Sequence, residues 1–235
     1  MSTLLLKLAG PLQSWGVSSR FNVRETRNYP SKSGILGLIA AAEGRRRSDP
    51  LEDLLDLQLA VRVDKPGKLV RDFHTAHNRA GRSMPLSHRY YLSDAVFVAG
   101  IEGPDGLIEG IKAAVESPVF TLFLGRRSCP PAFPLSLGLR DGPLGDVIEG
   151  EPWHAPTWFQ QQCGRQQGYR ARIIADQGVA TRTSGIDTEL VQDVPRSFDP
   201  ANRQYDWRRT TSWTISLLDA PSDRHDPMSL TVGGH

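Results

Sequence analysis

The chain has 235 residues, of which 39% are hydrophobic and 23% are charged, so one or two globular domains with a proper core are predicted. Its two cysteines are too few for a disulfide framework and form no CxxC motif, which predicts plain thiols in a reducing compartment. The apolar runs are too short to span a bilayer, and the N-terminal residues lack the basic region of a signal peptide, so we predict a cytoplasmic protein without membrane contact.

The net charge of +2 says little about partners, but the basic residues are clustered. Residues 20–47 contain seven Arg or Lys and two acidic residues, and residues 62–89 contain the same numbers. Together with Arg126 and Arg127, these segments hold 16 of the 28 basic residues and 4 of the 26 acidic ones. If the fold brings the segments together, they form the footprint of a polyanion partner; otherwise each is a separate solvated face.

The first predicted elements are a strand and a capped helix. Alternating leucines over residues 4–8 predict a strand, and Trp15 follows it as a base-stacking platform or a packing residue. Next comes a helix that Ser31 or Ser33 can cap and that Gly44 ends. Because a helix N-terminus offers free N–H groups, this one is either a phosphate cradle or a normal capped helix.

Residues 64–94 are basic and long for a simple connection. They follow a short helix near Leu54 and a half-buried strand over residues 57–63. We predict an extended hairpin with arms at 68–75 and 86–92 and a mobile tip around Gly81, with a disordered basic loop as the alternative. The spacing His74-x-x-His77 does not indicate a metal site, since no Cys, Asp or Glu set nearby completes a coordination shell, and no cofactor is predicted.

A basic motif follows the next strand–helix–strand pattern. We predict a central strand over 94–101, a helix from Asp105 to Pro118 and a strand over 119–124. The chain then reads LFLGRRSCPPAFP from Leu122 to Pro134. We interpret this stretch as a buried strand ending in a turn at Gly125, where another backbone can come close, followed at once by two guanidinium groups suited to phosphate.

The order of these elements predicts an α+β fold of the ferredoxin-like (RRM-like) β-α-β-β-α-β type, with an inserted thumb hairpin at about 64–94. We expect this domain over residues 1–135, a small irregular C-terminal β unit over 136–220, and a flexible tail over 221–235. Within the second unit, residues 140–152 are predicted as a linker or an exposed turn, residues 164–183 as a hairpin, and residues 191–198 and 211–218 as strands. The aromatic signature of RNA-recognition motifs is absent, so RNA binding would depend on loops and the hairpin.

Several motifs, in the same order along the chain, resemble a family of CRISPR proteins. They are LAGPLQSWG from Leu8 to Gly16, NYPSKSGILGLIAAAEG from Asn28 to Gly44, RYYLSDA from Arg89 to Ala95, LGRRSCP from Leu124 to Pro130, and the segments Pro195–Phe198 and Arg203–Tyr205. Together they are similar to the CasD family, the type I-E Cascade subunit that holds the 5′ handle of the guide RNA (crRNA). This family belongs to the repeat-associated RNA-binding superfamily, and the resemblance covers residues 4 to 205.

The resemblance implies a non-catalytic CRISPR RNA-binding subunit in antiviral defence. It would bind the crRNA 5′ handle, cap the CasC-type backbone subunits, contact the CasA-type large subunit, and meet target DNA only through the complex. The expected RNA-binding residues are Ser31, Lys32, Ser33, Arg71, Arg89, Tyr91, Gly125, Arg126 and Arg127. The alternative is a metal-independent endoribonuclease that processes repeat RNA, with His74, His77, His88 and Tyr91 as its candidate acid–base groups.

Overall fold

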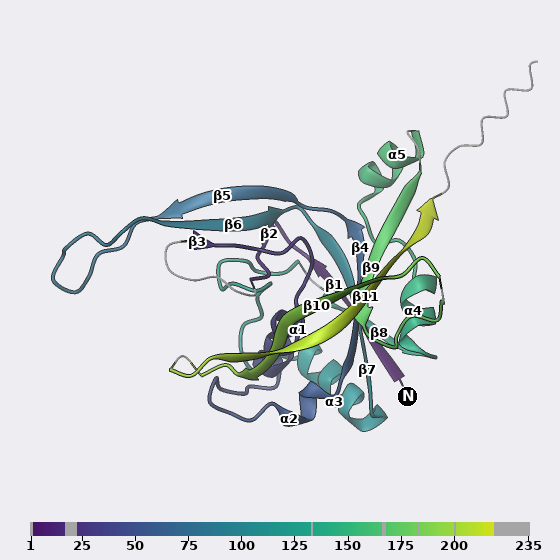
Figure 1. Ribbon diagram of the computed structural model, residues 1–235, viewed down its shortest axis with the longest axis horizontal. Coiled ribbons are helices and arrows are strands. Elements are labelled where there is room, and N and C mark those ends of the chain that lie inside the picture. The colour runs from purple at the N-terminus through teal and green to yellow at the C-terminus, as the bar shows by residue number, and fades with distance from the viewer. Residues whose placement is uncertain are drawn as a thin grey trace, which may run out of the picture.

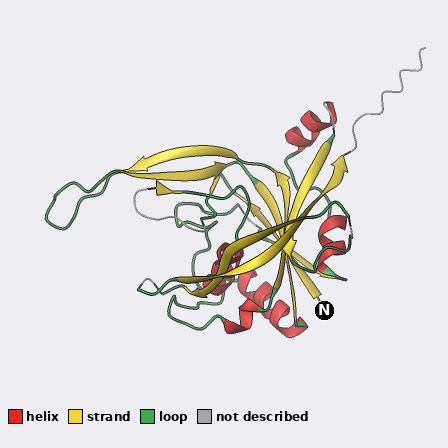
Figure 2. Ribbon diagram, viewed as in Figure 1, coloured by secondary structure: helices red, strands yellow, loops and turns green. Residues whose placement is uncertain are grey.

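The computed structural model describes residues 2–16, 23–132, 134–165, 168–182, 184–199 and 201–218. Its described part is a mixed α+β structure dominated by β-strands, with few helices (Figures 1 and 2). None of its helices is long and apolar enough to cross a membrane. The predicted flexible tail at 221–235 lies outside the described residues.

The elements follow one another along the chain in this order: β1 (Ser2–Ala9), β2 (Leu12–Gln13), β3 (Val23–Arg24), α1 (Lys32–Ala42), α2 (Glu52–Leu55), β4 (Gln58–Lys65), β5 (Lys68–His74), β6 (Ser87–Ser93), β7 (Val96–Gly103), α3 (Asp105–Glu116), β8 (Ser136–Asp141), α4 (Leu144–Gly150), α5 (Thr157–Arg165), β9 (Tyr169–Asp176), β10 (Asp187–Ser197) and β11 (Gln204–Leu218).

Seven strands form one antiparallel sheet in the order β10-β11-β9-β4-β7-β1-β8. The central strands β1 and β7 are almost continuously apolar because both faces of the sheet are covered. Leu4, Leu6 and Leu8 pack on one face in a core that includes α1 and α3. On the other face, Gly100 leaves room for the α4 side chains Leu144 and Ile148.

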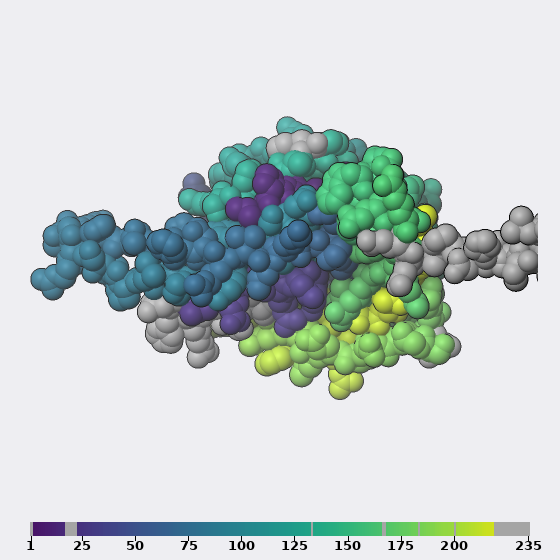
Figure 3. Space-filling model, turned by 90° about the horizontal axis from the view of Figure 1, so that it is seen from above, coloured from purple at the N-terminus to yellow at the C-terminus, as the bar shows by residue number. Residues whose placement is uncertain are grey.

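Strands β5 and β6 form the predicted hairpin, with seven residue pairs from Lys68↔Ser93 to His74↔Ser87. They belong to a second, smaller sheet with β2 and β3, and the hairpin projects well beyond the rest of the molecule (Figures 1 and 3). Gly81 adopts a positive φ of 75° at the tip. The extended hairpin is therefore confirmed, and the alternative of a disordered loop is wrong.

Three predictions of local structure are wrong. Residues 119–124 form no strand; instead, a loop crosses the end of α1, where Val119 N donates to Ala42 O at 2.9 Å. Residues 140–152 are not a linker, because Leu144 and Ile148 are buried and fold as α4. The predicted hairpin at 164–183 is also absent, since α5 occupies its start and β9 pairs with β4 and β11.

The strands that follow residue 141 extend the sheet that the earlier strands begin. Strand β9 pairs with β4, and β11 and β10 are added beyond it. Strand β8, which also begins after residue 135, pairs with β1 at the opposite edge. The division into units at about residue 135 stays a prediction. Both cysteines are buried free thiols, and burial raises the pKa of each.

Candidate nucleic-acid interface

A large groove runs along α1, between the loop of residues 119–127 and the strands β10 and β11. It encloses about 1500 Å³, more than the roughly 300–1,000 Å³ of typical small-molecule sites. One face of α1 forms its floor with small residues only, Gly34, Gly37, Ala40 and Ala41. The bulky residues of this helix, such as Leu36 and Ile39, point into the core instead. We call the two sides of the groove the loop wall (residues 119–127) and the β10–β11 wall (residues 192–206).

Arginine dominates the charged residues that line this groove. Among the described residues, seven arginines line it, namely Arg24, Arg45, Arg46, Arg47, Arg126, Arg127 and Arg203, against one acidic residue, Asp206. The Asp206 carboxylate is already paired with the Arg196 guanidinium. The groove is therefore strongly electropositive, and guanidinium groups are well suited to phosphate.

Gly125 is the point where the loop wall meets the loop after β2. Its φ is +83°, and a Cβ placed on it would lie 1.8 Å from the carbonyl oxygen of Ser14. The backbone hydrogen bond from Ser14 N to Leu124 O, at 3.1 Å, holds the two segments together. The sequence-based expectation of a close backbone approach at Gly125 is confirmed, and the approaching segment includes Trp15, a buried packing residue.

Replacing Gly125 should therefore damage the groove. We expect Gly125→Ala to lower the free energy of unfolding by about 2 to 3 kcal/mol, because a left-handed alanine is strained and the Ser14 backbone must also move. Gly81→Ala is the matched control, since Gly81 has a similar φ of +75° but no atom within 4 Å of its Cβ position. Urea unfolding of both variants measures the difference, and equal losses would contradict the close approach.

Arg126 connects three segments around one end of the groove. Its Nη2 donates to the carbonyl oxygen of Arg24 at 3.0 Å, and its guanidinium lies 4.8 Å from the centre of the Tyr91 ring. Its Nη1 is buried and has no hydrogen-bond partner among the described residues. Tyr91 itself is only 2% exposed, so its ring supports Arg126 from beneath and is not available for stacking on a base.

The N-terminus of α1 is a normal capped helix. Ser31 Oγ accepts from Gly34 N at 3.2 Å, and the N–H of Lys32 donates to the buried carboxylate of Asp193 at 2.8 Å. Ser31 and Ser33 line the groove. Lys32 does not, because its Nζ lies inside the protein, 2.8 Å from Leu57 O and 3.1 Å from Asp176 Oδ2. We therefore withdraw Lys32 from the expected phosphate contacts.

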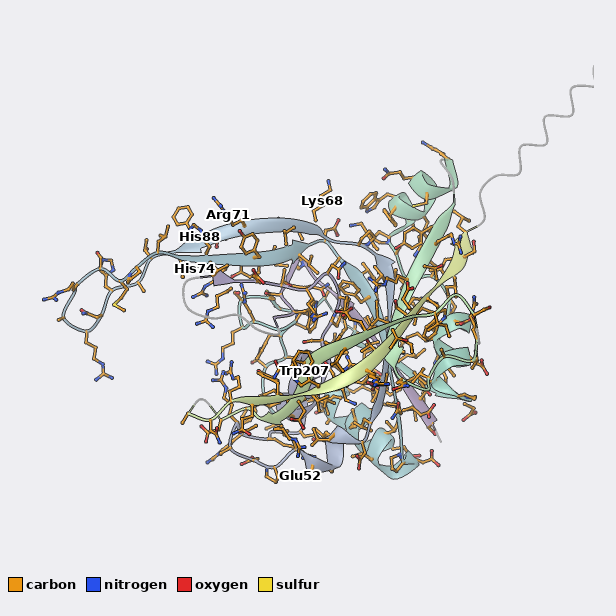
Figure 4. All side chains as sticks on the ribbon, viewed as in Figure 1. Glu52, Lys68, Arg71, His74, His88 and Trp207 are labelled. Atoms are coloured by element: carbon orange, nitrogen blue, oxygen red, sulfur yellow. The ribbon has the colours of Figure 1, made fainter. Side chains whose placement is uncertain are left out.

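Arg71 and Arg89 of the projecting hairpin do not line the groove. Arg71 pairs in register with Tyr90, on the face of the hairpin opposite to Tyr91, and projects outward in Figure 4. Arg89 lies on the inner face beside Arg24, through the pairing of β6 with β3. The hairpin therefore approaches the groove through Arg89 and Arg24, whereas Arg71 belongs to a separate surface. RNA contact by either residue stays a prediction.

Sequence reasoning missed several residues of the groove. Arg45, Arg46 and Arg47 were visible as a basic triplet, but nothing local indicated that the end of α1 opens into the groove. Arg46 and Arg47 are exposed and have no side-chain partner among the described residues, whereas Arg45 is bound to Glu43 and Asp53. The β10–β11 wall adds Arg203 and Tyr205, which belong to a motif that the family resemblance had already singled out.

Comparison with known proteins agrees with this geometry. The family model described as CRISPR-associated protein (Cas_Cas5) matches residues 3–211. The chain belongs to the Cas5 family. Among curated relatives, the Cas5 chain is 37% identical over 158 residues to the CRISPR system Cascade subunit CasD of Escherichia coli K12, covering 58% of this chain and 70% of the relative.

Solved structures also resemble this Cas5 chain along nearly its whole length. A chain of a structure described as a CRISPR RNA-guided surveillance complex is 34% identical, with a TM-score of 0.71, over 94% of this chain and 91% of that one. A second, described as a crystal structure of a Cas protein, is 33% identical, with a TM-score of 0.64, over 93% of this chain and 95% of the other. The resemblance stated from the sequence motifs is thereby confirmed at the level of the family.

Proposed function

We propose that this chain is a CRISPR RNA-binding subunit of a type I-E Cascade surveillance complex and that it holds the crRNA 5′ handle in the groove along α1. The observation that carries this function is the groove itself, whose lining in the described part of the chain has seven arginines and one acidic residue that is already paired. The membership in the Cas5 family and the likeness to a Cascade subunit point to the same kind of partner.

The projecting hairpin is proposed to contact neighbouring proteins in the complex. It extends far from the core, and its outer face exposes Leu69 and Phe73, each 63% exposed, on either side of Arg71. Apolar side chains next to a charge are typical of a surface that another protein covers. We assign this face of the hairpin to contact with CasC-type backbone subunits. The CasA-type subunit would contact other surfaces of the chain, and target DNA would be bound only through the complex.

A binding role without catalysis is proposed because the candidate acid–base groups lie away from the groove. None of the described histidines lines it. His74 Nε2 lies 3.0 Å from Asp72 Oδ2 on the hairpin, and Figure 4 places His74 and His88 along the hairpin toward its tip. Tyr91 is buried beneath Arg126. This arrangement favours a binding subunit over the alternative of a metal-independent endoribonuclease.

A ferredoxin-like core is proposed for the first part of the chain. Its support is the antiparallel order β8-β1-β7-β4, with α1 between β1 and β4 in sequence and α3 between β7 and β8. This is the strand arrangement of a β-α-β-β-α-β unit. In it, β8 provides the last strand that the sequence had assigned to residues 119–124.

The experiment that tests this function is expression of the tagged chain together with a repeat array and the other Cascade subunits. We expect the purified protein to retain RNA and to protect the 5′ end of that RNA from nuclease. RNA binding should fall with salt, with a log–log slope of about 0.7 for each phosphate contact on a single strand. Purified protein without RNA, or protection of the 3′ end alone, would contradict the proposal. Cleavage of repeat RNA in EDTA would favour the endoribonuclease.

A further inference from the structure

Both walls of the groove hold aromatic side chains as well as arginines. Phe120 and Phe123 belong to the loop wall, whereas Phe198 and Tyr205 belong to the β10–β11 wall. Phe120 is 44% exposed, and its backbone N donates to Ala41 O at 3.1 Å, which fixes it beside the last turn of α1. Aromatic rings on opposite walls of one electropositive groove are a contiguous feature, unlike apolar residues scattered over a surface.

Between these walls, the floor of the groove is lined by small residues, and aromatic rings cover part of it. A Cβ placed on Gly34 would lie 2.7 Å from the Trp15 ring, and one placed on Gly37 would lie 3.5 Å from the Phe198 ring. The groove encloses about 1500 Å³, so more than one planar group can enter between the two aromatic walls.

The arginines gather at the two ends of this floor. Arg46 and Arg47 follow the C-terminal end of α1, whereas Arg126 and Arg127 lie near its N-terminal end, where Gly125 contacts the Ser14–Trp15 segment. The groove therefore has arginines at its two ends and aromatic rings between them, and this arrangement matches the chemistry of a short single-stranded RNA. Its phosphates carry the negative charge, and its unpaired bases offer flat faces for stacking.

We infer that the groove is a base-stacking cleft, in which unpaired bases of single-stranded RNA stack on Phe120 and Tyr205 while flanking phosphates meet the two arginine clusters. The inference rests on the proposed function and adds to it the way in which the RNA is read. The bases must turn inward, toward α1. A base-paired duplex cannot insert its bases between the walls, so the groove selects unpaired RNA.

Burial raises the pKa of the Tyr205 hydroxyl above its ordinary value, and the nearby Arg203 opposes this rise. Tyr205 therefore remains a neutral phenol at physiological pH, with an uncharged ring face and a hydroxyl that can donate a hydrogen bond. A neutral aromatic ring beside the arginines is compatible with stacking, because it adds no negative charge against the RNA backbone.

The test uses the full chain and three probes: fluorescently labelled oligoadenylate RNA, an abasic RNA of the same length that keeps every phosphate, and the oligoadenylate–oligouridylate duplex. The variants are Phe120→Leu and Tyr205→Leu, together with Phe120→Tyr as a variant that keeps an aromatic ring. Trp207→Leu is the matched control, because Trp207 is 60% exposed on β11 but does not line the groove.

We expect each leucine variant at the groove to weaken oligoadenylate binding by about fivefold or more, the effect of losing one base–aromatic stack. The same leucine variants should not change the binding of abasic RNA, which is already weak in the wild-type protein. Phe120→Tyr and Trp207→Leu should keep the wild-type affinity for oligoadenylate. The wild-type protein should bind the duplex more weakly than the single strand.

Equal binding of oligoadenylate and abasic RNA by the wild-type protein would overturn the stacking cleft while leaving RNA binding in place. Equal losses on both RNAs in Phe120→Leu and Tyr205→Leu would also overturn it, because they would mark the rings as structural. If the wild-type protein bound none of the three probes or the co-expressed crRNA, the proposed function itself would fail.

Discussion

Asp193→Ala is expected to lower the free energy of unfolding by about 3 to 5 kcal/mol, the usual cost of removing one partner of a buried ion pair. The Asp193 side chain is fully buried and accepts from Arg208 Nε at 2.6 Å and from Arg208 Nη2 at 3.0 Å. It also accepts from the N–H of Lys32 at 2.8 Å. Removing it would leave the largely buried Arg208 with Asp176 as its remaining carboxylate partner and would leave the N–H of Lys32, at the start of α1, without its acceptor.

The effect should also reach the groove, because this cluster joins α1 to β9, β10 and β11 and so fixes the floor of the groove to one wall. Burial alone would lower the pKa of the Arg208 guanidinium, but the carboxylates of Asp193 and Asp176 raise it above its ordinary value. We therefore expect Asp193→Ala to weaken RNA binding at temperatures where the variant is still folded. Urea unfolding and RNA titration of the same preparation measure both effects.

The matched control is Asp206→Ala, which removes another carboxylate of the β10–β11 pair. Its partner Arg196 is 61% exposed, and exposed ion pairs contribute only about 0 to 1 kcal/mol. A loss in Asp193→Ala no larger than the loss in Asp206→Ala would show that the buried cluster does not connect the helix and the strands as described.

The sequence predicted correctly those helices and strands whose formation depends on residues close together in the chain. The capping serine and the closing Gly44 were enough to predict α1, and the basic character and unusual length of residues 64–94 led to the hairpin. The strand predicted at 119–124 failed because its apolar residues Leu122 and Leu124 are buried through loop packing. An apolar run in a sequence does not say whether the backbone finds a neighbouring strand or only a hydrophobic surface.

The site was harder to predict, because its residues are placed by contacts between distant parts of the chain. Lys32 looked like a phosphate ligand, yet its partner Asp176 lies 144 residues further along and draws the ammonium inside. Conversely, Arg45–Arg47 belonged to a basic cluster that the sequence left as either a polyanion footprint or a solvated face, and in the structure they line the groove together with the β10–β11 wall. The clustering of basic residues indicated a polyanion partner, but only the fold showed which Arg and Lys side chains line the groove.

Replacing Arg46, Arg47 and Arg127 together by glutamine should weaken crRNA binding by about a thousandfold, if each loses one charge-assisted contact of about 1.5 kcal/mol. All three side chains line the groove, are exposed, and have no hydrogen-bond or ion-pair partner among the described residues. Their loss should therefore cost little folding stability. The magnitude of the log–log salt slope should fall by about 2, since each contact to a single strand contributes about 0.7.

A triple variant at Arg170, Arg172 and Arg209, each replaced by glutamine, separates local contact from overall charge. These arginines are exposed on β9 and β11 and do not line the groove, yet the variant has the same net charge as the first. We expect it to keep most of the wild-type affinity and nearly all of the salt slope, because attraction between distant charges is screened within about 8 Å at physiological salt. If both triple variants lost affinity equally, RNA would be held by the general positive field of the protein and not by the groove along α1.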